Sequence, residues 1–333
     1  MTEMLRFFSE EERAALQKIA QKIKNCDSVA IVTHMRPDGD AYGSSLALAE
    51  AIRSTGKICA VCDETPVPEN LVFLPETADI QNDLPLDYGL YIACDCADVQ
   101  RMGQLSAAFQ EAEKRACSVN IDHHVSNTRF AKENFVRVCS ANCMNVLALI
   151  ETLDVPLTER IANLLMTGLL TDSGCFSHDD VSEETFAAAA RLVSCGADVC
   201  ALQYRLFKKQ SKERALLHGQ TMSKMRFDFD DRFAYIVVTR EAMETLGAPQ
   251  SATEGFVDFP LSVDSVEICA SILEVKKNQY KISLRSKSYA DVNRLAATFG
   301  GGGHVRAAGC MLNGNLYEVI DKLSYAVSQY LRD

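Results

Sequence analysis

Residues 28–54 of the chain read SVAIVTHMRPDGDAYGSSLALAEAIRS. Residues 28–33 are mostly apolar and β-branched, as in a strand that is buried on both faces, and residues 41–54 have the pattern of a helix. The polar turn between them carries His34, Asp38 and Asp40. A strand that leads directly into a helix begins a strand–helix–strand unit, so this stretch predicts a parallel sheet with ionisable side chains where its first strand ends.

The same alternation continues through the first half of the chain. Short apolar runs predict further strands at 57–63, 89–94 and 117–121. Helical patterns lie between and after them, at 99–114, 141–153 and 158–170. We therefore expect an α/β fold whose N-terminal domain is a doubly wound parallel sheet.

The pattern changes in the second half. Helical character extends from 182 to 217, with a break at 195–196, and the residues beyond it predict a mixed sheet. The expected elements are strands at 233–239, 266–275 and 280–285, a helix at 291–299, four glycines at 300–303 and a last helix at 316–331. The sequence thus predicts an N-terminal domain over 1–195, a helical connector over 196–225 and a smaller C-terminal α+β domain over 226–333.

Composition limits the classes of protein that fit. The 333 residues include 34 Lys and Arg against 45 Asp and Glu, a formal net charge of −11, which argues against a partner that is a long duplex nucleic acid. The apolar runs fall far short of the ~20 residues that a membrane helix needs, and residues 1–13 lack the features of a signal peptide. We expect no membrane segment, and a cytoplasmic protein whose 13 cysteines stay reduced.

Acids and histidines gather where the predicted strands end. They are His34, Asp38, Asp40, Asp95, Asp122, His123, His124 and Asp172, each expected at or just beyond the carboxyl end of a strand. Taken singly, most have an ordinary interpretation as a turn or a helix cap. Taken together, they converge on the edge of a parallel sheet where ligands bind. Crowded carboxylates repel one another unless cations bind between them, so the set predicts a pair of divalent ions held by carboxylates and imidazoles.

These residues resemble the motifs of the DHH phosphoesterase superfamily. The matching stretches are, in order, THMRPDGDAYGS (33–44), Asp95, IDHH (121–124) and TDSG (171–174). Farther along, SLRS (283–286) and FGGGGHVRAAG (299–309) resemble the associated DHHA1 domain. In size and layout the chain is most similar to the NrnA-type subfamily of nano-RNases and 3′-phosphoadenosine 5′-phosphate (PAP) phosphatases.

The resemblance implies a role for each residue of the first set. It assigns two Mn²⁺ ions, with Mg²⁺ or Co²⁺ as alternatives, to two groups of ligands: His34, Asp38 and Asp95, and Asp40, Asp95, His123 and Asp172. Asp95 would bridge the ions, and a hydroxide held between them would attack phosphorus. Asp122 would orient His123 from behind, and His124 would face the scissile phosphate as a catalytic residue.

The C-terminal motif is expected to bind substrate. Consecutive glycines let a backbone approach an anion closely and direct several N–H groups at it, and an arginine can grip a phosphate with two nitrogens. The residues expected to form this clamp are Arg285, Gly301, Gly302, Gly303 and His304. Arg294 and Arg306 are weaker candidates. Two fixed sites, one for a phosphate and one for cleavage, would favour short substrates.

The resemblance implies hydrolysis of very short RNA, from dinucleotides to about five nucleotides, to 5′-mononucleotides, and removal of the 3′-phosphate of PAP. Alternatives are a phosphodiesterase for linear dinucleotides such as pApA or pGpG, and a nucleotide sensor without turnover. A homodimer is left open. One stretch departs from the subfamily pattern, because SANCMN (140–145) stands where a Ser-Ser-Thr-type stretch with an acid is usual. Asn142 is expected to cap the helix there.

Overall fold

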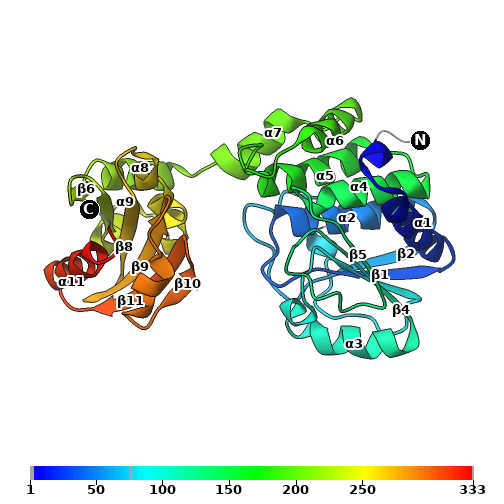
Figure 1. Cartoon of the computed structure of the whole chain (residues 1–333), viewed down its shortest axis with the longest axis horizontal. Coiled ribbons are helices and arrows are strands. Elements are labelled where there is room, and N and C mark those ends of the chain that lie inside the picture. Colours follow the sequence, from blue (N-terminus) through cyan, green and yellow to red (C-terminus); the bar gives the residue numbers. More distant parts are fainter. Residues whose placement is uncertain (1–3, 76, 332–333) are drawn as a thin grey trace. The chain divides into compact units, whose positions relative to one another are not determined.

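The computed structural model divides the chain into two compact units, Met1–Lys209 and Gln210–Asp333 (Figure 1). It describes residues 4–75 and 77–331, so the extreme ends of the two predicted domains lie outside the described residues. The boundary after Lys209 falls inside the stretch that the sequence predicts as a connector. That stretch is divided between the units, because α7 (Val199–Gln203) belongs to the first and α8 (Lys212–Met222) to the second.

The first unit is built around a five-stranded sheet in which every pair of neighbouring strands is parallel. In spatial order the strands are β2 (Ile58–Cys62), β1 (Ser28–Val32), β3 (Leu90–Cys94), β4 (Cys117–Asp122) and β5 (Glu133–Val136). Figure 1 shows α3 on one side of this sheet and the other large helices on the opposite side. These helices are α1 (Glu10–Lys24), α2 (Gly39–Ser54), α3 (Leu105–Arg115), α4 (Asn142–Leu153) and α5 (Glu159–Asp172). Helices on both faces of a parallel sheet confirm the predicted doubly wound fold.

Shorter elements complete the first unit. They are the 3₁₀ turns η1 (Met4–Phe7), η2 (Thr77–Asp79) and η3 (Val99–Met102), the helix α6 (Glu183–Ser194) and the π-helical turn η4 (Tyr204–Lys208). Among the described residues, no single helix is long and apolar enough to cross a membrane. The segments Glu183–Ser194 and Val199–Lys208 reach that length and composition only when they are counted together across a bend of 114°.

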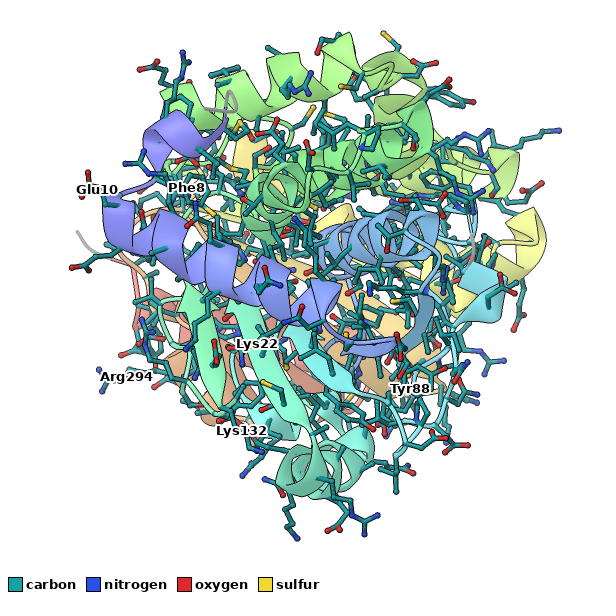
Figure 2. The ribbon with its side chains drawn as sticks, turned by 90° about the vertical axis from the view of Figure 1, so that its right-hand side faces the viewer. Phe8, Glu10, Lys22, Tyr88, Lys132 and Arg294 are labelled. Atoms are coloured by element: carbon teal, nitrogen blue, oxygen red, sulfur yellow. The ribbon has the colours of Figure 1, made fainter. Side chains whose placement is uncertain are left out.

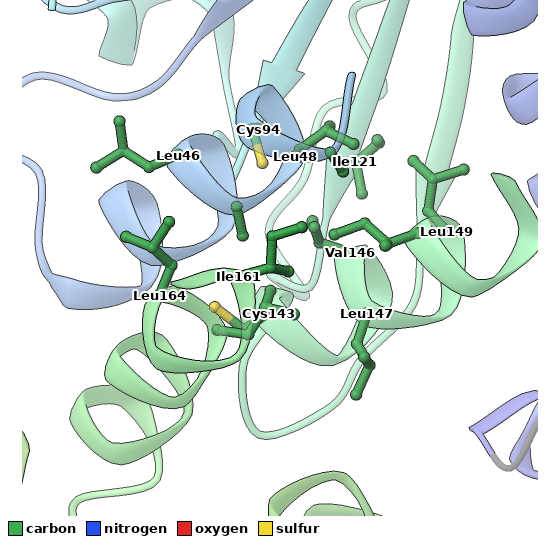
Figure 3. Packing of buried hydrophobic residues seen from close by; sticks show 14 of the residues in the cluster. Leu46, Leu48, Cys94, Ile121, Cys143, Val146, Leu147, Leu149, Ile161 and Leu164 are labelled. Atoms are coloured by element: carbon green, nitrogen blue, oxygen red, sulfur yellow. The ribbon is translucent and has the colours of Figure 1, made fainter. Parts of the chain in front are cut away.

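Side chains of the parallel strands alternate between two cores. Ile31 belongs to the larger core, under α1, α2 and α4, whereas Val32 belongs to the core on the side of α3. Both are fully buried, which explains why these strands read as continuous apolar runs. Figure 3 shows part of the larger core, to which Leu46 of α2, Val146 of α4 and Ile161 of α5 contribute.

Charged contacts fasten α1 to the sheet beneath it (Figure 2). The Nζ atom of Lys22 lies 2.8 Å from Oε1 of Glu133 on β5. Just beyond β5, the guanidinium of Arg137 covers the ring of Phe8 at 4.1 Å and donates a hydrogen bond to Glu184 of α6. These contacts fix α1 and α6 around the loop that leads from β5 into α4.

Glycines allow α2, α5 and α4 to approach one another closely. A Cβ on Gly43 of α2 would lie 2.6 Å from the carbonyl oxygen of Leu164 on α5. A Cβ on Gly168 of α5 would lie 2.2 Å from Sγ of Cys143 and 2.5 Å from Oδ1 of Asp40. No side chain fits at either distance. The close contact brings the start of α2, the start of α4 and the end of α5 together.

The second unit contains a six-stranded sheet. Its strands in spatial order are β10 (Gly302–His304), β11 (Ala307–Asn313), β9 (Gln279–Ser286), β8 (Ile268–Lys276), β7 (Phe233–Val238) and β6 (Arg226–Asp228). The pair β7–β8 is parallel and the other pairs are antiparallel, which confirms the predicted mixed sheet.

Helices pack on both faces of this sheet. On the first face, α10 (Val292–Ala297) and α11 (Leu316–Ser328) pack on the strands. The other face carries α8 and α9 (Arg240–Leu246) together with the 3₁₀ turns η5 (Gln250–Thr253), η6 (Phe256–Asp258) and η7 (Pro260–Ser262). The predicted helix at 291–299 is shorter in the structure, and the glycines that follow it lead into the edge strand β10 instead of a free loop.

We expect the substitution Gly168→Ala to lower the free energy of unfolding of the first unit by about 1–3 kcal/mol, because the new methyl group must displace Cys143 or Asp40. Gly219→Ala in α8 is the matched control, since a Cβ there meets nothing within 4 Å and alanine favours a helix. Chemical denaturation of both variants measures the difference. Equal stability of the Gly168→Ala variant and the wild-type chain would contradict the close helix contact.

Candidate metal centre

Loops after three strands bring most of the predicted site residues to one edge of the first sheet. His34 follows β1 after one intervening residue, Asp95 follows β3, and β4 ends at Asp122, directly before His123 and His124. These three strands are neighbours in the sheet, in the order β1-β3-β4. Their carboxyl ends therefore place the side chains next to one another, as the sequence predicts.

The start of α2 supplies two more carboxylates to this edge. Asp38 is the N-cap of α2, and its Oδ1 accepts hydrogen bonds from the backbone N–H groups of Asp40 and Ala41 at 3.1 and 3.0 Å. Asp38 is therefore a helix cap as well as a candidate metal ligand. Its second oxygen, Oδ2, lies 4.0 Å from Nε2 of His34 and is free of the cap.

Asp172 reaches the cluster from a helix, not from a strand. It is the last residue of α5, so the expectation that it follows a strand was wrong. The short apolar run before it does not distinguish a strand from a buried helix. The chain turns sharply after it, because Gly174, Cys175 and Phe176 all have left-handed backbones with φ of 56°, 56° and 66°.

Asp95 lies at the centre of the cluster and is fully buried. Its Oδ2 is 3.7 Å from Nε2 of His34, and its Oδ1 is 3.4 Å from Nε2 of His123. Nε2 of His123 is also 3.4 Å from Oδ2 of Asp172 and 3.9 Å from Oδ2 of Asp40. Asp95 has a left-handed backbone with φ of 55°, an uncommon conformation outside glycine, which aims its carboxylate between the two imidazoles.

Asp40 is held by the start of α4. Its two oxygens accept hydrogen bonds from the backbone N–H groups of Asn142 and Cys143, at 2.5 and 2.9 Å. The N-cap of α4 is Ala141, whose side chain cannot cap, so the expectation that Asn142 caps the helix was wrong. Asp40 satisfies these helix N–H groups from another helix, and the positive end of α4 stabilises its negative charge.

Carbonyl groups orient both central imidazoles. Nδ1 of His34 lies 3.0 Å from the carbonyl oxygen of Met35, and Nδ1 of His123 lies 2.9 Å from that of Cys139. Because a carbonyl can only accept, Nδ1 carries the proton in each ring. Nε2 of each ring then presents a lone pair to the carboxylates around it, as a metal ligand does.

Asp122 orients His124, whereas the sequence predicts that it orients His123. Its Oδ1 lies 2.8 Å from Nδ1 of His124, and its Oδ2 accepts a hydrogen bond of 2.6 Å from Nδ2 of Asn127. The expectation was wrong because the side chains of adjacent residues leave a strand end in different directions, and sequence adjacency does not say which ring the carboxylate faces. Asn127 was missed, and an asparagine in a loop gives no signal of its role.

Burial and neighbouring charges shift the pKa values of several groups in the cluster. Burial, followed by the charge of Asp95, raises the pKa of Asp40 above its usual range. Burial and the charges of Asp40 and Asp38 likewise raise the pKa of Asp172. Burial lowers the pKa of His34, but its contacts with Asp95 outweigh that effect and raise it. Each group thus shifts toward the form with less negative charge, as expected where positive charge is needed.

Buried polar atoms without partners also indicate that the cluster needs positive charge. Among the described residues, Oδ1 of Asp95 and Nε2 of His123 are buried without a hydrogen-bond partner. Each of these atoms nevertheless lies close to other possible metal-ligand atoms of the cluster. Three groups of donor atoms lie within 4.8 Å of one another: His34, Asp38 and Asp95; Asp40, His123 and Asp172; and Asp95, His123 and His124. Buried ligand atoms with no protein partner fit divalent metal ions.

Comparison with known proteins agrees with this geometry. The model of the DHH family, N-terminal domain, matches residues 28–169, and that of the DHHA1 domain matches residues 231–333. A bifunctional oligoribonuclease and PAP phosphatase NrnA from Thermus thermophilus is 32% identical over 95% of this chain and 94% of its own length. The chain belongs to the DHH family. A Bacillus subtilis protein of the same description is 24% identical over 89% of this DHH-family chain and 92% of its own length.

Solved structures share the fold of this DHH-family chain. An exopolyphosphatase-related protein from Bacteroides fragilis superposes with a TM-score of 0.81 at 28% identity, over 95% of this chain and 96% of that one. The RecJ protein of Thermus thermophilus, solved with Mn²⁺, superposes with a TM-score of 0.52 at 12% identity, over 97% of this chain and 55% of its own. The second of these likenesses concerns the fold alone.

In the DHHA1 domain, the residues expected to bind substrate lie on adjacent strands. His304 of β10 pairs with Ala307 of β11, which pairs with Arg285 of β9. Nε of Arg285 donates to Oδ1 of Asp258 at 3.0 Å, and Nη1 donates to the carbonyl oxygen of Leu284 at 3.0 Å. A guanidinium has five N–H groups, so these two bonds leave the second N–H of Nη1 and both of Nη2 for a two-nitrogen grip on phosphate. Glycines 301–303 lie just before and within β10.

Arg306, a weaker candidate, has a structural role. Its guanidinium donates to the carbonyl oxygens of Ala290 and Ser288, the loop before α10. Four donor groups of residues 288–290 in the same loop bond to the buried carboxylate of Glu267, including the N–H of Ala290 at 2.8 Å. Arg294 is exposed on α10 (Figure 2), and its backbone N–H bonds to Asp291.

Divalent ions should stabilise the first unit through Asp95. At a free Mn²⁺ concentration of 100 times its dissociation constant, we expect about 2.7 kcal/mol of added stability for the wild-type chain. Asp95→Asn should lose most of this gain, because the variant removes charge from the centre of the cluster. The exposed Asp154→Asn is the matched control, since Asn also accepts the left-handed backbone of that position. A full Mn²⁺ response in Asp95→Asn, measured by thermal unfolding, would contradict the central role of Asp95.

The stability of the metal-free chain should depend on pH in a defined direction. The raised pKa values of Asp40 and Asp172 mean that the folded chain binds protons that an unfolded Asp releases near pH 4. The free energy of unfolding in EDTA therefore falls as the pH rises above about 4, and the raised pKa of His34 adds to the fall at higher pH. Saturating Mn²⁺ should flatten this slope between about pH 6 and 8. A slope that is the same with and without the ion would contradict the interpretation.

Proposed function

We propose that this chain is a metal-dependent phosphoesterase that hydrolyses very short RNA to 5′-mononucleotides and removes the 3′-phosphate of PAP. The observation that carries the proposal is the complete donor set at the sheet edge, in a chain that is 32% identical over 95% of its length to a bifunctional oligoribonuclease and PAP phosphatase. A sensor without turnover would have no need of a full set of ligands. None of the eight predicted residues is displaced from the cluster.

The donor set suits two ions. One would be held by His34, Asp38 and Asp95, and the other by Asp40, Asp95, His123 and Asp172, with Asp95 shared. Mixed carboxylate and imidazole donors favour Mn²⁺, with Mg²⁺ or Co²⁺ as alternatives. Such a pair of ions supplies a nucleophile at neutral pH and neutralises charge on the reacting phosphate.

His124 is suited to give a proton to the leaving oxygen. Its Nδ1 is bound to Asp122, which is the largest cause of the raised pKa of His124, and its ring is about one-third exposed. The imidazole is thus kept protonated toward neutral pH and faces solvent, where a substrate can reach it. Asp122 in turn is stabilised as a carboxylate, because its bonds to His124 and Asn127 outweigh its burial and lower its pKa.

The C-terminal unit is proposed to bind a phosphate of the substrate through Arg285, His304 and the backbone of Gly301, Gly302 and Gly303. Asp258 keeps the guanidinium of Arg285 in place at the end of β9. The partners of the chain are then short RNA oligonucleotides and nucleotides, and long duplex nucleic acid is not among them. A cytoplasmic location remains a prediction from the sequence, and a homodimer is left open.

The proposed activity is tested by turnover with Mn²⁺ of a 5′-labelled RNA dinucleotide, a 24-mer and PAP. We expect rapid cleavage of the dinucleotide, release of phosphate from PAP and little turnover of the 24-mer. Arg285→Ala should raise KM for the dinucleotide by about tenfold or more and leave a small phenyl phosphodiester unaffected, since a charge-assisted hydrogen bond contributes about 1.5–3 kcal/mol. Lys281→Ala, four residues earlier on the same face of β9, is the control. Equal losses on both substrates would contradict the binding role of the C-terminal unit.

Loss of the Asp122 carboxylate should change the pH profile. In Asp122→Asn the pKa of His124 falls toward its ordinary value, so the alkaline limb of kcat should move to lower pH, and kcat near pH 8 should fall by about tenfold or more. The measurement is kcat against pH with Mn²⁺, and Asp154→Asn is again the control. An unchanged alkaline limb would show that His124 does not supply the proton.

A further inference from the structure

Strand β2 ends at the same edge of the first sheet as the candidate metal ligands. It runs parallel to β1, and Asp63, Glu64 and Thr65 follow it. None of the three groups of donor atoms found among the described residues includes these side chains. Asp63 is nevertheless buried, with 1% of its surface exposed. A buried carboxylate is costly unless donors surround it, so its partners show what it holds in place.

The carboxylate of Asp63 binds two hydroxyl groups. Its Oδ2 accepts a hydrogen bond of 2.7 Å from the phenol of Tyr42, a buried residue of α2 two positions after Asp40. The hydroxyl of Thr65 lies 2.9 Å from both carboxylate oxygens, and the backbone N–H of Thr65 donates to Oδ1 at 3.1 Å. Because a carboxylate can only accept, the hydroxyl of Thr65 gives its proton to Asp63 and keeps its lone pairs for another donor.

That other donor is the backbone N–H of Arg36, which lies 3.1 Å from Oγ1 of Thr65. Arg36 stands between His34 and Asp38 and has a left-handed backbone with φ of 57°. The residue before a proline favours an extended backbone, and Pro37 follows Arg36. A backbone in such a conformation persists only where its surroundings hold it. The hydroxyl of Thr65 therefore helps to hold the turn that carries two of the candidate ligands.

Two further contacts close a ring of segments at this edge. The backbone N–H of Met35 donates to the carbonyl oxygen of Arg101 at 2.7 Å. The backbone N–H of Gln104 donates to the carboxylate of Glu64 at 2.5 Å, beside Gly103, where a Cβ would collide with that carboxylate. The segments that follow β1, β2 and β3 thus hold one another, and the segment after β2 binds both of the others.

One of the two ions in the proposed function has the ligand group His34, Asp38 and Asp95. We propose that Asp63 and Thr65 are positioning residues for this ion, because they fix the turn that carries two of its ligands. The inference rests on the metal centre of the proposed function and adds to it the side chains that set one ligand group. Partners behind the ligands of a metal ion typically change its affinity by about 10–100-fold.

The ligand group of the other ion is fixed by different contacts. Asp40 is bound by the backbone N–H groups of Asn142 and Cys143, and His123 is oriented by the carbonyl oxygen of Cys139. These contacts come from the loop after β5 and the start of α4. Loss of the contacts of Thr65 should therefore weaken one ion and leave the other nearly unchanged.

Binding of Mn²⁺ to the full chain tests the proposal without turnover, through the electron paramagnetic resonance signal of the free ion. The wild-type chain should bind two ions. Thr65→Val, which removes the hydroxyl, should weaken one of them by about tenfold or more and leave the other within about threefold. Thr65→Ser keeps the hydroxyl and should restore the binding. Thr55→Val is the matched control, because that hydroxyl binds the carbonyl oxygen of Ile52 at the opposite end of α2.

Tyr42→Phe is a second variant that removes only a hydroxyl group. It should weaken the same ion by about three- to tenfold, the value of one hydrogen bond. Tyr91→Phe is its control, since Tyr91 is equally buried at the start of β3 and binds the carbonyl oxygen of Pro85, away from the ligand edge. Chemical denaturation in EDTA separates the two roles. A merely structural role lowers the stability of both tyrosine variants and leaves the Mn²⁺ affinity of both unchanged.

Outcomes for the positioning role and for the activity can be separated. If the wild-type chain binds two Mn²⁺ ions and both Thr65→Val and Tyr42→Phe bind them equally well, the positioning role is wrong and the proposed function stands. Equal weakening of both ions in Thr65→Val also overturns the positioning role. If Thr65→Val weakens one ion but the wild-type chain turns over neither the RNA dinucleotide nor PAP, the positioning role stands and the proposed function is wrong. A wild-type chain that binds no Mn²⁺ overturns both.

Discussion

The repulsion among Asp40, Asp95 and Asp172 is the constraint around which the first unit is arranged. Three carboxylates converge on the imidazole of His123 within 4 Å, and burial raises the pKa values of Asp40 and Asp172. A cluster of this kind costs folding free energy unless cations occupy it. The surrounding structure therefore has to hold it in place, and each close helix contact in the first unit serves that end.

The glycines and helix ends supply the restraint. Gly43 and Gly168 let α2 and α5 meet without side chains between them, so that the starts of α2 and α4 lie within hydrogen-bond distance of each other. The N–H groups at the positive end of α4 then donate hydrogen bonds to Asp40. The N–H groups that Asp40 accepts from lie in the stretch 140–145 that departs from the subfamily pattern.

The two units carry different kinds of side chains at their candidate sites. The first holds donors for metal ions and a histidine whose pKa is raised for proton transfer. The second carries the nitrogen donors of Arg285 and His304 on one face of its sheet.

Local sequence is enough to predict the parallel sheet, the order of its elements and the residues that gather at its edge. Apolar runs reveal buried parallel strands, and the carboxyl ends of such strands share one edge, so His34, Asp95 and His123 could be placed together from their positions alone. The hydrogen-bond partners of these residues depend on the tertiary structure. That Asp122 binds His124, that Cys139 orients His123, and that Asp172 arrives on a helix depend on side-chain directions and on packing between distant segments. Local sequence does not encode these. Cys139 lies 16 residues beyond His123 and meets it only in the folded unit, and the ring that Asp122 faces depends on the directions of side chains only two residues apart.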